Sequence, residues 1–248
     1  LLAASSGNFG QALACAAAML GKKCSIVMPE GAAATKKEAV LHYGAQLHLV
    51  DTARETRKAA VKTLAAQIEN VEVLSAYDDE RVILGNSTLG EEIARIDDID
   101  CVLVPVGGGG LLSGIIEGLR RQGKDIPVWG AEPKLANDGA RSLRAGELLA
   151  NSNEPATIAD GARTISLGVR NFALIKEKAA GILEVEEESI ARALVKLFHL
   201  ANLKVEPTGA LALAALLDHS EELAGKKLLL VLSGGNVDPA NYSRLISG

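Results

Sequence analysis

Four consecutive glycines, Gly107 to Gly110, are the residues of this sequence whose type and spacing point most directly to chemistry. An apolar run over 101–106 precedes them, and a helix-like segment over 111–123 follows. A strand, a glycine turn and a helix form a recurring anion-binding arrangement, because glycine lets backbone N–H groups approach a ligand and the helix N-terminus adds partial positive charge. The segment therefore predicts an anion site, with a tight loop that binds nothing as the alternative.

The common nucleotide-binding motifs do not fit this loop. A dinucleotide fingerprint needs G-x-G-x-x-G, but counting from Gly107 puts Leu112 at the last position, and counting from Gly108 puts Ser113 there. A Walker A loop needs a Lys followed by Ser or Thr, and this pair does not occur here. A phosphate would be held by neutral amides, through charge-assisted hydrogen bonds of roughly 1.5–3 kcal/mol each. This favours a resident cofactor phosphate and disfavours a nicotinamide-dependent dehydrogenase.

Two further polar turns follow apolar strand-like runs in the same way. They are "ASSGNFGQ" over 4–11 and "SGGNVD" over 233–238. In parallel sheets, ligands bind beyond the carboxyl ends of the strands. We therefore expect the three turns to contribute to one pocket.

The elements that would position these turns alternate between strand-like apolar runs and helix-like segments. The predicted strands cover 24–29, 45–50, 71–76, 101–106, 128–132, 181–187 and 227–236. The predicted helices cover 34–43, 53–69, 79–96, 111–123 and 138–146, and a further helix follows 187 and ends at Leu203. Continuous apolar strands separated by helices predict an α/β fold with mostly parallel sheets in a three-layer αβα arrangement.

Composition excludes several classes of function. The 248 residues carry a formal net charge of −5, aromatic residues make up 3%, and no Lys/Arg block occurs, which argues against a nucleic-acid surface. The longest apolar stretch, Gly209 to Leu217, is too short to span a bilayer, so no membrane partner is expected. Cys15, Cys24 and Cys101 lack metal-type spacing and predict buried thiols in a reducing, cytoplasmic compartment.

The segment "AEPKLAND" contains a candidate metal site. Glu132, the Ala136 carbonyl and Asp138 stand at offsets of four and six residues. Two carboxylates and a carbonyl are hard oxygen ligands suited to Mg²⁺, Ca²⁺ or Mn²⁺ rather than zinc. The alternative is a solvated acidic loop that caps the following helix.

The three turns, in their order and spacing, resemble those of the tryptophan-synthase-β-like family of pyridoxal-phosphate enzymes (fold type II). The similarity runs along nearly the whole chain, through "VPVGGGGLLSGI", "TIADGAR", "VEPTGALALAAL" and "LSGGNVD". The "SSGN" turn and the unbroken glycines look like the serine/threonine dehydratase and serine racemase branch, since cysteine-synthase relatives usually carry Thr-rich versions. Phe9 stands where many relatives have His, and "GNST" over 85–88 where many have Gly-Gln-Gly-Thr, so the exact substrate stays open.

The resemblance implies a two-domain enzyme. Residues 1–76 would form a small, substrate-side α/β domain, and residues 77–248 a large, cofactor-binding α/β domain. Two copies are expected to form a homodimer, with a small amino acid as the substrate.

The resemblance also assigns roles around pyridoxal 5′-phosphate. Asn8 would hydrogen-bond the phenolic oxygen of the ring, although it could simply stabilise a turn. Ser233 would face the pyridine nitrogen, although it could simply end a strand. A neutral hydroxyl cannot hold that nitrogen protonated as a carboxylate would, which favours elimination of a good leaving group over a long-lived carbanion. The cofactor phosphate would be cradled by the backbone of Gly107, Gly108, Gly109, Gly110 and Leu111.

The first turn would hold the substrate. Its members Ser5, Ser6, Gly7 and Phe9 would bind the substrate carboxylate at a helix N-terminus. Ser6 would lie opposite the catalytic lysine, where a racemase needs a second acid/base group, although a serine alone has too high a pKa to act as a base. The alternative for Ser6 is a helix N-cap. Glu206 would border the ring or cap the next helix, and metal-activated members of the branch share the spacing of Glu132, Ala136 and Asp138.

In this family the Schiff-base lysine precedes the "SSGN" turn in a Ser-x-Lys context. The sequence starts at Leu1, and none of its lysines has these surroundings. We therefore expect that lysine, with the first part of the large domain, in a natural N-terminal segment outside this sequence, and we expect the chain alone to be inactive.

The predicted reaction removes the α-proton of serine or threonine and eliminates water, after which the enamine hydrolyses to a 2-oxo acid and ammonia. A serine racemase is the alternative within the family, because it shares the first step. A catalytically silent module that kept the pocket but lost the lysine is the alternative from another class.

Overall fold

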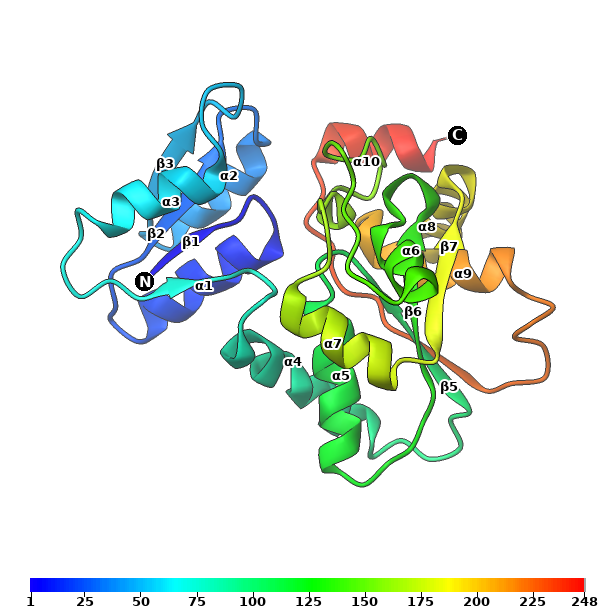
Figure 1. Ribbon diagram of the computed structural model, residues 1–248. Helices are drawn as coiled ribbons and strands as arrows, with labels where there is room; N and C mark the ends of the chain where they lie inside the picture. The colour runs from blue at the N-terminus through cyan, green and yellow to red at the C-terminus, as the bar shows by residue number, and fades with distance from the viewer. Residues whose placement is uncertain (248) are drawn as a thin grey trace. The chain divides into compact units, whose positions relative to one another are not determined.

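The computed structural model describes residues 1–247, and the chain divides into two compact units, Leu1–Ala76 and Tyr77–Gly248. Each unit contains one parallel sheet of four strands (Figure 1). The substrate-side and cofactor-side roles that the sequence suggests for 1–76 and 77–248 remain predictions.

The first unit alternates strand and helix in the order that the sequence predicts. Its sheet has the order β3-β2-β1-β4. Ala3, Ile26 and Met28 face a core shared with α1 and α2, whereas Leu2 and Val27 face a core shared with α3. The sheet is therefore covered on both faces. The elements are β1 (Leu2–Ala4), α1 (Asn8–Met19), β2 (Ser25–Pro29), α2 (Ala34–His42), β3 (Gln46–Val50), α3 (Arg57–Ala65) and β4 (Val73–Leu74).

The second unit repeats this plan on a larger scale. Its sheet has the order β7-β6-β5-β8. One core joins Leu103 of β5 to α8 and α9, and the other joins Val102 and Val104 to α4 and α5, so helices cover both faces. This confirms the α/β fold with parallel sheets. The main elements are α4 (Glu80–Ile93), β5 (Cys101–Pro105), α5 (Gly110–Arg121), β6 (Val128–Pro133), α6 (Asp138–Ala145), α7 (Val169–Lys178), β7 (Gly181–Val185), α8 (Glu187–Ala201), α9 (Leu211–Asp218), β8 (Leu228–Leu230) and α10 (Pro239–Ile246), with short 3₁₀ turns at Lys134–Ala136, Asp160–Ala162 and Thr208–Ala210.

Several predicted elements are shorter in the structure, and of the strand predicted over 71–76 only Val73–Leu74 (β4) is formed. The helix predicted over 53–69 is α3, which begins only after Thr56, because the Thr56 hydroxyl accepts the Ala59 N–H at 3.2 Å and caps it there. The strand predicted over 227–236 pairs with β5 only over Leu228–Leu230. The next ladder bond in this register would need an N–H from Pro105, which proline lacks, so the strand ends.

The longest apolar stretch of the sequence lies in the core. Leu211, Ala212, Ala214 and Ala215 of α9 are all buried. The apolar character of this stretch therefore fits a core helix. In the described part of the chain, no helix is long and apolar enough to cross a membrane.

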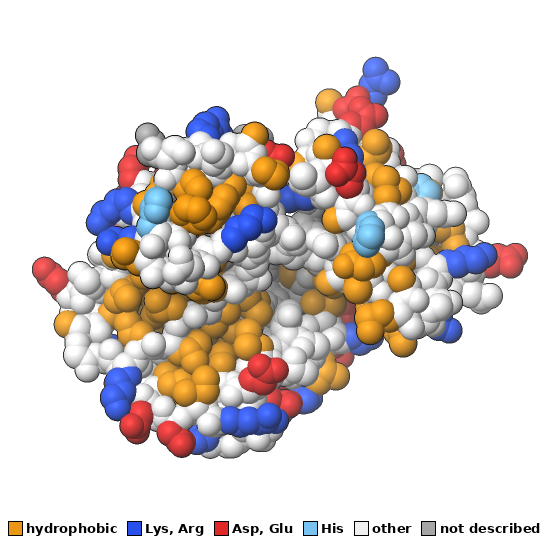
Figure 2. Space-filling view, turned by 180° about the vertical axis from the view of Figure 1, so that it is seen from behind, with side chains coloured by type: hydrophobic (Ala, Val, Ile, Leu, Met, Phe, Trp, Pro, Cys, Tyr) orange, Lys and Arg blue, Asp and Glu red, His pale blue; other side chains and the backbone are white. Residues whose placement is uncertain are grey.

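Charged side chains are dispersed on the visible surface. On the face that Figure 2 shows, Lys and Arg are interspersed with Asp, Glu and apolar side chains rather than gathered in one basic patch. This matches the modest net charge of −5.

Helices α4 and α5 cross at two glycines. A Cβ on Gly118 would overlap the Ser87 carbonyl oxygen and lie 2.7 Å from the Gly90 Cα. A Cβ on Gly90 would lie 2.9 Å from the Gly118 Cα. The two backbones therefore pack directly against each other and fix α5, the helix that follows the glycine run.

We expect Gly118→Ala to lower the free energy of unfolding by about 1–3 kcal/mol, because the added methyl must push the two helices apart. Gly85→Ala on α4 is the matched control, since nothing lies within 4 Å of its Cβ position. There the change should raise stability by up to about 1 kcal/mol through helix propensity. Urea unfolding measures both, and equal stabilities for the two variants would contradict the close crossing.

Candidate functional site

The glycine run forms the predicted turn between β5 and α5. Helix α5 begins at Gly110, and its N-cap Gly109 has φ +87°, a left-handed conformation that favours glycine. Gly108, Gly109 and Gly110 are buried. Within the described residues, the amide N–H groups from Gly108 to Leu111 donate to no other protein group. Because buried amides without partners are rare, an anion at this helix N-terminus would satisfy them.

The loop has no room for side chains. A Cβ on Gly107 would lie 2.6 Å from the Gly161 carbonyl oxygen. A Cβ on Gly108 would enter the ring of Tyr77, and one on Gly110 would lie 3.1 Å from the Tyr77 backbone. The run is therefore glycine because neighbouring protein touches its backbone on several sides, in addition to any ligand.

Two further motifs support the loop from behind. The Gly161 N–H donates to the Thr208 hydroxyl at 2.9 Å, which ties "TIADGAR" to "VEPTG" at the residue that touches Gly107. The sequence marked both motifs as similar to the family but assigned them no supporting role. Nothing in the sequence pointed to Tyr77, because its contact with Gly108 exists only in the folded unit.

Ser233 lies at the same edge of the sheet as the glycine loop. It follows β8, which pairs in parallel with β5, and its side chain is exposed. The neighbouring "VEPTG" segment packs on this turn, because the Glu206 N–H donates to the Gly234 carbonyl at 2.9 Å. Within the second unit, the carboxyl ends of two adjacent strands therefore present polar turns side by side.

The "SSGN" turn connects β1 to α1 in the first unit. The buried Ser5 hydroxyl accepts the N–H of Gly10 at 3.0 Å and that of Gly7 at 3.3 Å. Gly7 is the N-cap of α1. Ser5 therefore satisfies the helix terminus, and the alternative of Ser6 as the N-cap is wrong.

Ser6 differs from Ser5 in its hydrogen bonding. Among the described residues, its hydroxyl makes no hydrogen bond, and the amide N–H groups of Ser6 and Phe9 have no acceptor. Asn8 is the first residue of α1 and is half-buried. Free amides at a helix N-terminus suit a carboxylate. The meeting of this turn with the two turns of the second unit in one pocket remains a prediction.

Glu132 ends β6 and is 1% exposed. Its carboxylate accepts the N–H of Ala140 at 2.6 Å and that of Gly139 at 3.3 Å, so it caps α6 from within the protein. Burial raises the pKa of Glu132 to about 8, and the nearby Asp138 carboxylate adds to this. The side chain is therefore a buried acid rather than part of a solvated loop.

Asp138 is also buried and begins α6. One carboxylate oxygen accepts a hydrogen bond from Asn151 Nδ2 at 2.9 Å, while Oδ2 is buried with no hydrogen-bond partner among the described residues. Burial raises the pKa of Asp138 to about 6. Ala136 lies between the two acids in the Lys134–Ala136 turn and is buried.

A hard divalent cation would satisfy the unpartnered Asp138 oxygen and would favour the ionised form of both acids, whose pKa values burial raises. In the described chain, no group of three or more His, Cys, Asp or Glu residues is arranged to hold a metal. The predicted set has two carboxylates and a backbone carbonyl, so it differs from such a group in composition.

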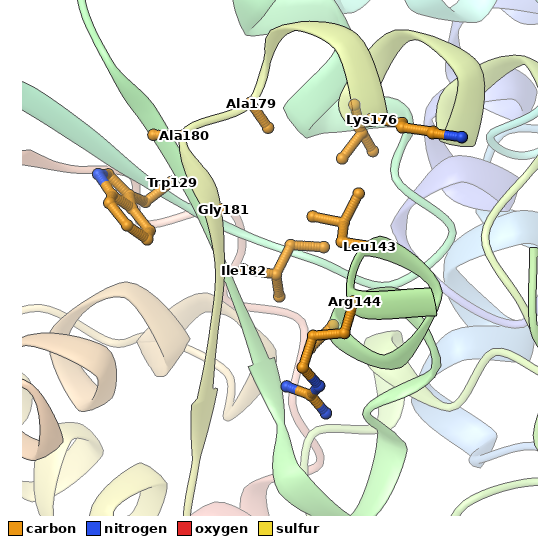
Figure 3. A pocket seen from close by; sticks show the side chains of 10 residues that line it. Trp129, Leu143, Arg144, Lys176, Ala179, Ala180, Gly181 and Ile182 are labelled. Atoms are coloured by element: carbon orange, nitrogen blue, oxygen red, sulfur yellow. The ribbon is translucent and has the colours of Figure 1, made fainter. Parts of the chain in front are cut away.

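A hollow of about 350 Å³ lies elsewhere in the second unit (Figure 3). Its lining includes Trp129, Leu143, Arg144, Lys176 and Ile182 and none of the predicted site residues. Its two cations are already paired, Arg144 with the Glu184 carboxylate at 2.6 Å and Lys176 with the Gly146 carbonyl at 2.7 Å. The predicted site residues therefore lie outside this hollow.

Comparison with known proteins supplies the chemical context. The family model for pyridoxal-phosphate dependent enzymes matches residues 1–234. The L-threo-3-hydroxyaspartate ammonia-lyase of Saccharomyces cerevisiae is 40% identical over 249 residues, which cover 100% of this chain and 76% of that enzyme. The serine racemase of Schizosaccharomyces pombe is 37% identical over 250 residues, which cover 100% of this chain and 76% of that enzyme.

Solved structures agree with these relatives. The T.th. threonine deaminase superimposes with a TM-score of 0.89 at 41% identity, over 96% of this chain and 77% of that one. Maize serine racemase superimposes with a TM-score of 0.92 at 30% identity, over 100% of this chain and 76% of that one.

Ser5→Ala should loosen the start of α1, because it leaves the amides of Gly7 and Gly10 without their acceptor. We expect a loss of about 1 kcal/mol in local stability, read from faster hydrogen exchange of the α1 amides. Ser6→Ala is the matched control. It should change the free energy of local opening, as read from the exchange rates, by less than about 0.5 kcal/mol. Equal effects of the two variants would refute the division of labour between these serines.

Proposed function

Because this chain belongs to the pyridoxal-phosphate-dependent enzyme family, we propose that its protein converts a small β-hydroxy amino acid, serine or threonine, into a 2-oxo acid and ammonia. The observation that carries the proposal is the buried glycine turn at the start of α5, whose amide donors have no protein acceptor among residues 1–247. Relatives named as ammonia-lyases, a threonine deaminase and serine racemases support an enzyme that acts on small amino acids.

The second unit would hold the cofactor. The amides of Gly107 to Gly110 and of Leu111 would bind its phosphate, since the loop brings unpaired N–H groups to a helix N-terminus. Ser233, at the same sheet edge, would meet the pyridine nitrogen with a neutral hydroxyl. When bound, pyridoxal 5′-phosphate supplies an electron sink for the α-carbon of an amino acid.

The first unit would hold the substrate. The amides of Ser6 and Phe9 at the start of α1 would bind its carboxylate, and Ser5 would keep that terminus in shape through its two accepted hydrogen bonds. Asn8 would orient the cofactor ring through its phenolic oxygen. Ser6 Oγ, which has no partner among the described residues, would lie opposite the catalytic lysine, where racemisation but not elimination needs a second acid/base group.

Racemisation is the second candidate activity, because serine racemases are among the relatives and Ser6 Oγ is free to serve as the acid on the second face. Elimination and racemisation share the removal of the α-proton and differ in the step after it. A racemase must return the proton from the opposite side, whereas elimination needs only departure of the hydroxyl group.

Ser6→Ala separates these two activities. In the protein expressed from its complete gene, we expect D-serine formation from L-serine to fall by about 10²-fold or more, the usual contribution of an acid/base group. Formation of 2-oxo acid should fall by less than about tenfold. Chiral chromatography and a keto-acid assay measure the two products.

Ser25→Ala in β2 is the control for this experiment, because its hydroxyl donates to Gln46 Oε1 and lies outside the turn. It should leave both rates unchanged. An equal fall of both activities in Ser6→Ala would argue that Ser6 only positions the substrate.

The acidic pair would hold Mg²⁺, Ca²⁺ or Mn²⁺. Glu132, the Ala136 carbonyl and Asp138 offer hard oxygen ligands, and the unpartnered Asp138 Oδ2 is the feature that supports the proposal. The cation would act structurally, by joining β6 to α6 and neutralising buried charge.

Each of the three cations alone should raise the melting temperature of the protein by roughly 5–10 °C at about 100 times its Kd. Asp138→Asn should abolish this shift, whereas Asp125→Asn, which alters an exposed carboxylate, should preserve it. A shift of the same size in Asp138→Asn would rule out the site.

The silent binding module is tested by borohydride reduction of the protein expressed from its complete gene. The enzyme proposal predicts a stable cofactor adduct on one lysine. Intact mass and peptide mapping locate it. An adduct scattered over surface lysines, or none, would favour the silent module.

The homodimer and the cytoplasmic location also remain predictions. Light scattering on the same preparation measures the mass of the assembly, and a monomeric mass would refute the dimer.

A further inference from the structure

Asn171 is a buried side chain that no part of the proposed chemistry has used. It lies in the first turn of α7 and is 0% exposed. Its Nδ2 donates to the Gly108 carbonyl at 2.7 Å and to the Tyr77 carbonyl at 3.0 Å. The orientation of this amide is fixed, because the reverse orientation would point its oxygen at two carbonyl oxygens.

The Gly108 carbonyl is the acceptor that links Asn171 to the glycine loop. It also receives the N–H of Gly168 at 3.0 Å, so two donors from the start of α7 hold it in one direction. The peptide bond between Gly108 and Gly109 is planar and trans, and its C=O and N–H point in opposite directions. Fixing the Gly108 oxygen therefore fixes the direction of the Gly109 N–H, one of the donors without a protein partner.

The start of α7, which carries Asn171, is itself held in place by Asp78. The Asp78 carboxylate accepts the N–H of Val169 at 3.1 Å and that of Arg170 at 3.0 Å, which caps α7. Asp78 follows Tyr77 directly, and Tyr77 fills the space where a Cβ of Gly108 would lie. The start of α7, Tyr77 and the glycine loop therefore form one closed set of contacts.

We propose that Asn171 is a positioning residue for the cofactor phosphate, which orients the amide donors of the glycine loop through the Gly108 carbonyl. The proposal rests on the function proposed above and adds to it a residue that sets phosphate affinity. Asn171 acts through the loop and does not contact the phosphate itself, so its effect is confined to ligands that carry this group.

The test compares two ligands, pyridoxal 5′-phosphate and pyridoxal, which differ only in the phosphate. Binding of each to the cofactor-free protein, expressed from its complete gene, is measured by absorbance titration. Asn171→Asp keeps the shape of the side chain but replaces the donor with an acceptor that faces two carbonyls. We expect the Kd for pyridoxal 5′-phosphate to rise at least about tenfold, while the Kd for pyridoxal changes by less than about twofold.

Two further variants complete the design. Asn171→Ala removes the donor without adding charge and should show the same selective loss, which covers the case in which Asn171→Asp fails to fold. Asn241→Asp makes the same chemical change on α10, where the side chain accepts from Arg244, and should bind both ligands like the wild type. The ³¹P resonance of the bound cofactor should shift in the Asn171 variants and not in Asn241→Asp.

The outcomes separate the two proposals. If the wild type fails to bind pyridoxal 5′-phosphate, the proposed function fails and this inference fails with it. If the wild type binds and the Asn171 variants bind equally well, or lose both ligands to the same extent, only the role of Asn171 is overturned.

Discussion

The close approach of protein backbone around the glycine run is the constraint on which the candidate site depends. A side chain at Gly107 or Gly108 would collide with Gly161 or Tyr77, so the loop keeps its shape only as bare backbone. The same packing buries the loop and, in the part of the chain that the structure describes, leaves its amides without protein acceptors. A tightly packed loop with unpaired donors is rigid before a ligand arrives, and a rigid site loses little freedom on binding.

Parts of the chain that are far apart in sequence build this rigidity. The hydrogen bond from Asn171 to Gly108 spans 63 residues, and that from Gly161 to Thr208 spans 47. A parallel sheet makes such convergence natural, because every strand ends at the same edge and the following turns gather there. Proline at position 105 ends the pairing with β8 at this edge, so the chain can leave the sheet as the polar "SGGN" turn.

A pair of buried acids is the second organising feature. Glu132 caps α6 through two backbone amides, and Asp138 keeps one oxygen without a partner, so the pair stores an electrostatic cost within the second unit. In the first unit the arrangement is different. The Ser5 hydroxyl accepts two backbone amides at the start of α1. The adjacent Ser6 is therefore not needed as a cap, and its hydroxyl makes no hydrogen bond among the described residues.

The sequence by itself determined the fold class, the order of most strands and helices, the family, and the glycine turn between a strand and a helix. These follow from local patterns, namely apolar periodicity, glycine runs and motif order, which are readable without the fold. The sequence misjudged the ends of several elements, including the 71–76 strand. The 53–69 helix starts late because Thr56 caps it, and the 227–236 strand ends early because Pro105 lacks an N–H. Only the tertiary structure decided which serine caps α1, that both acids of "AEPKLAND" are buried, and that Tyr77, Thr208 and Asn171 support the glycine loop. Those outcomes depend on contacts between distant segments, and such contacts leave no periodic signal in the sequence.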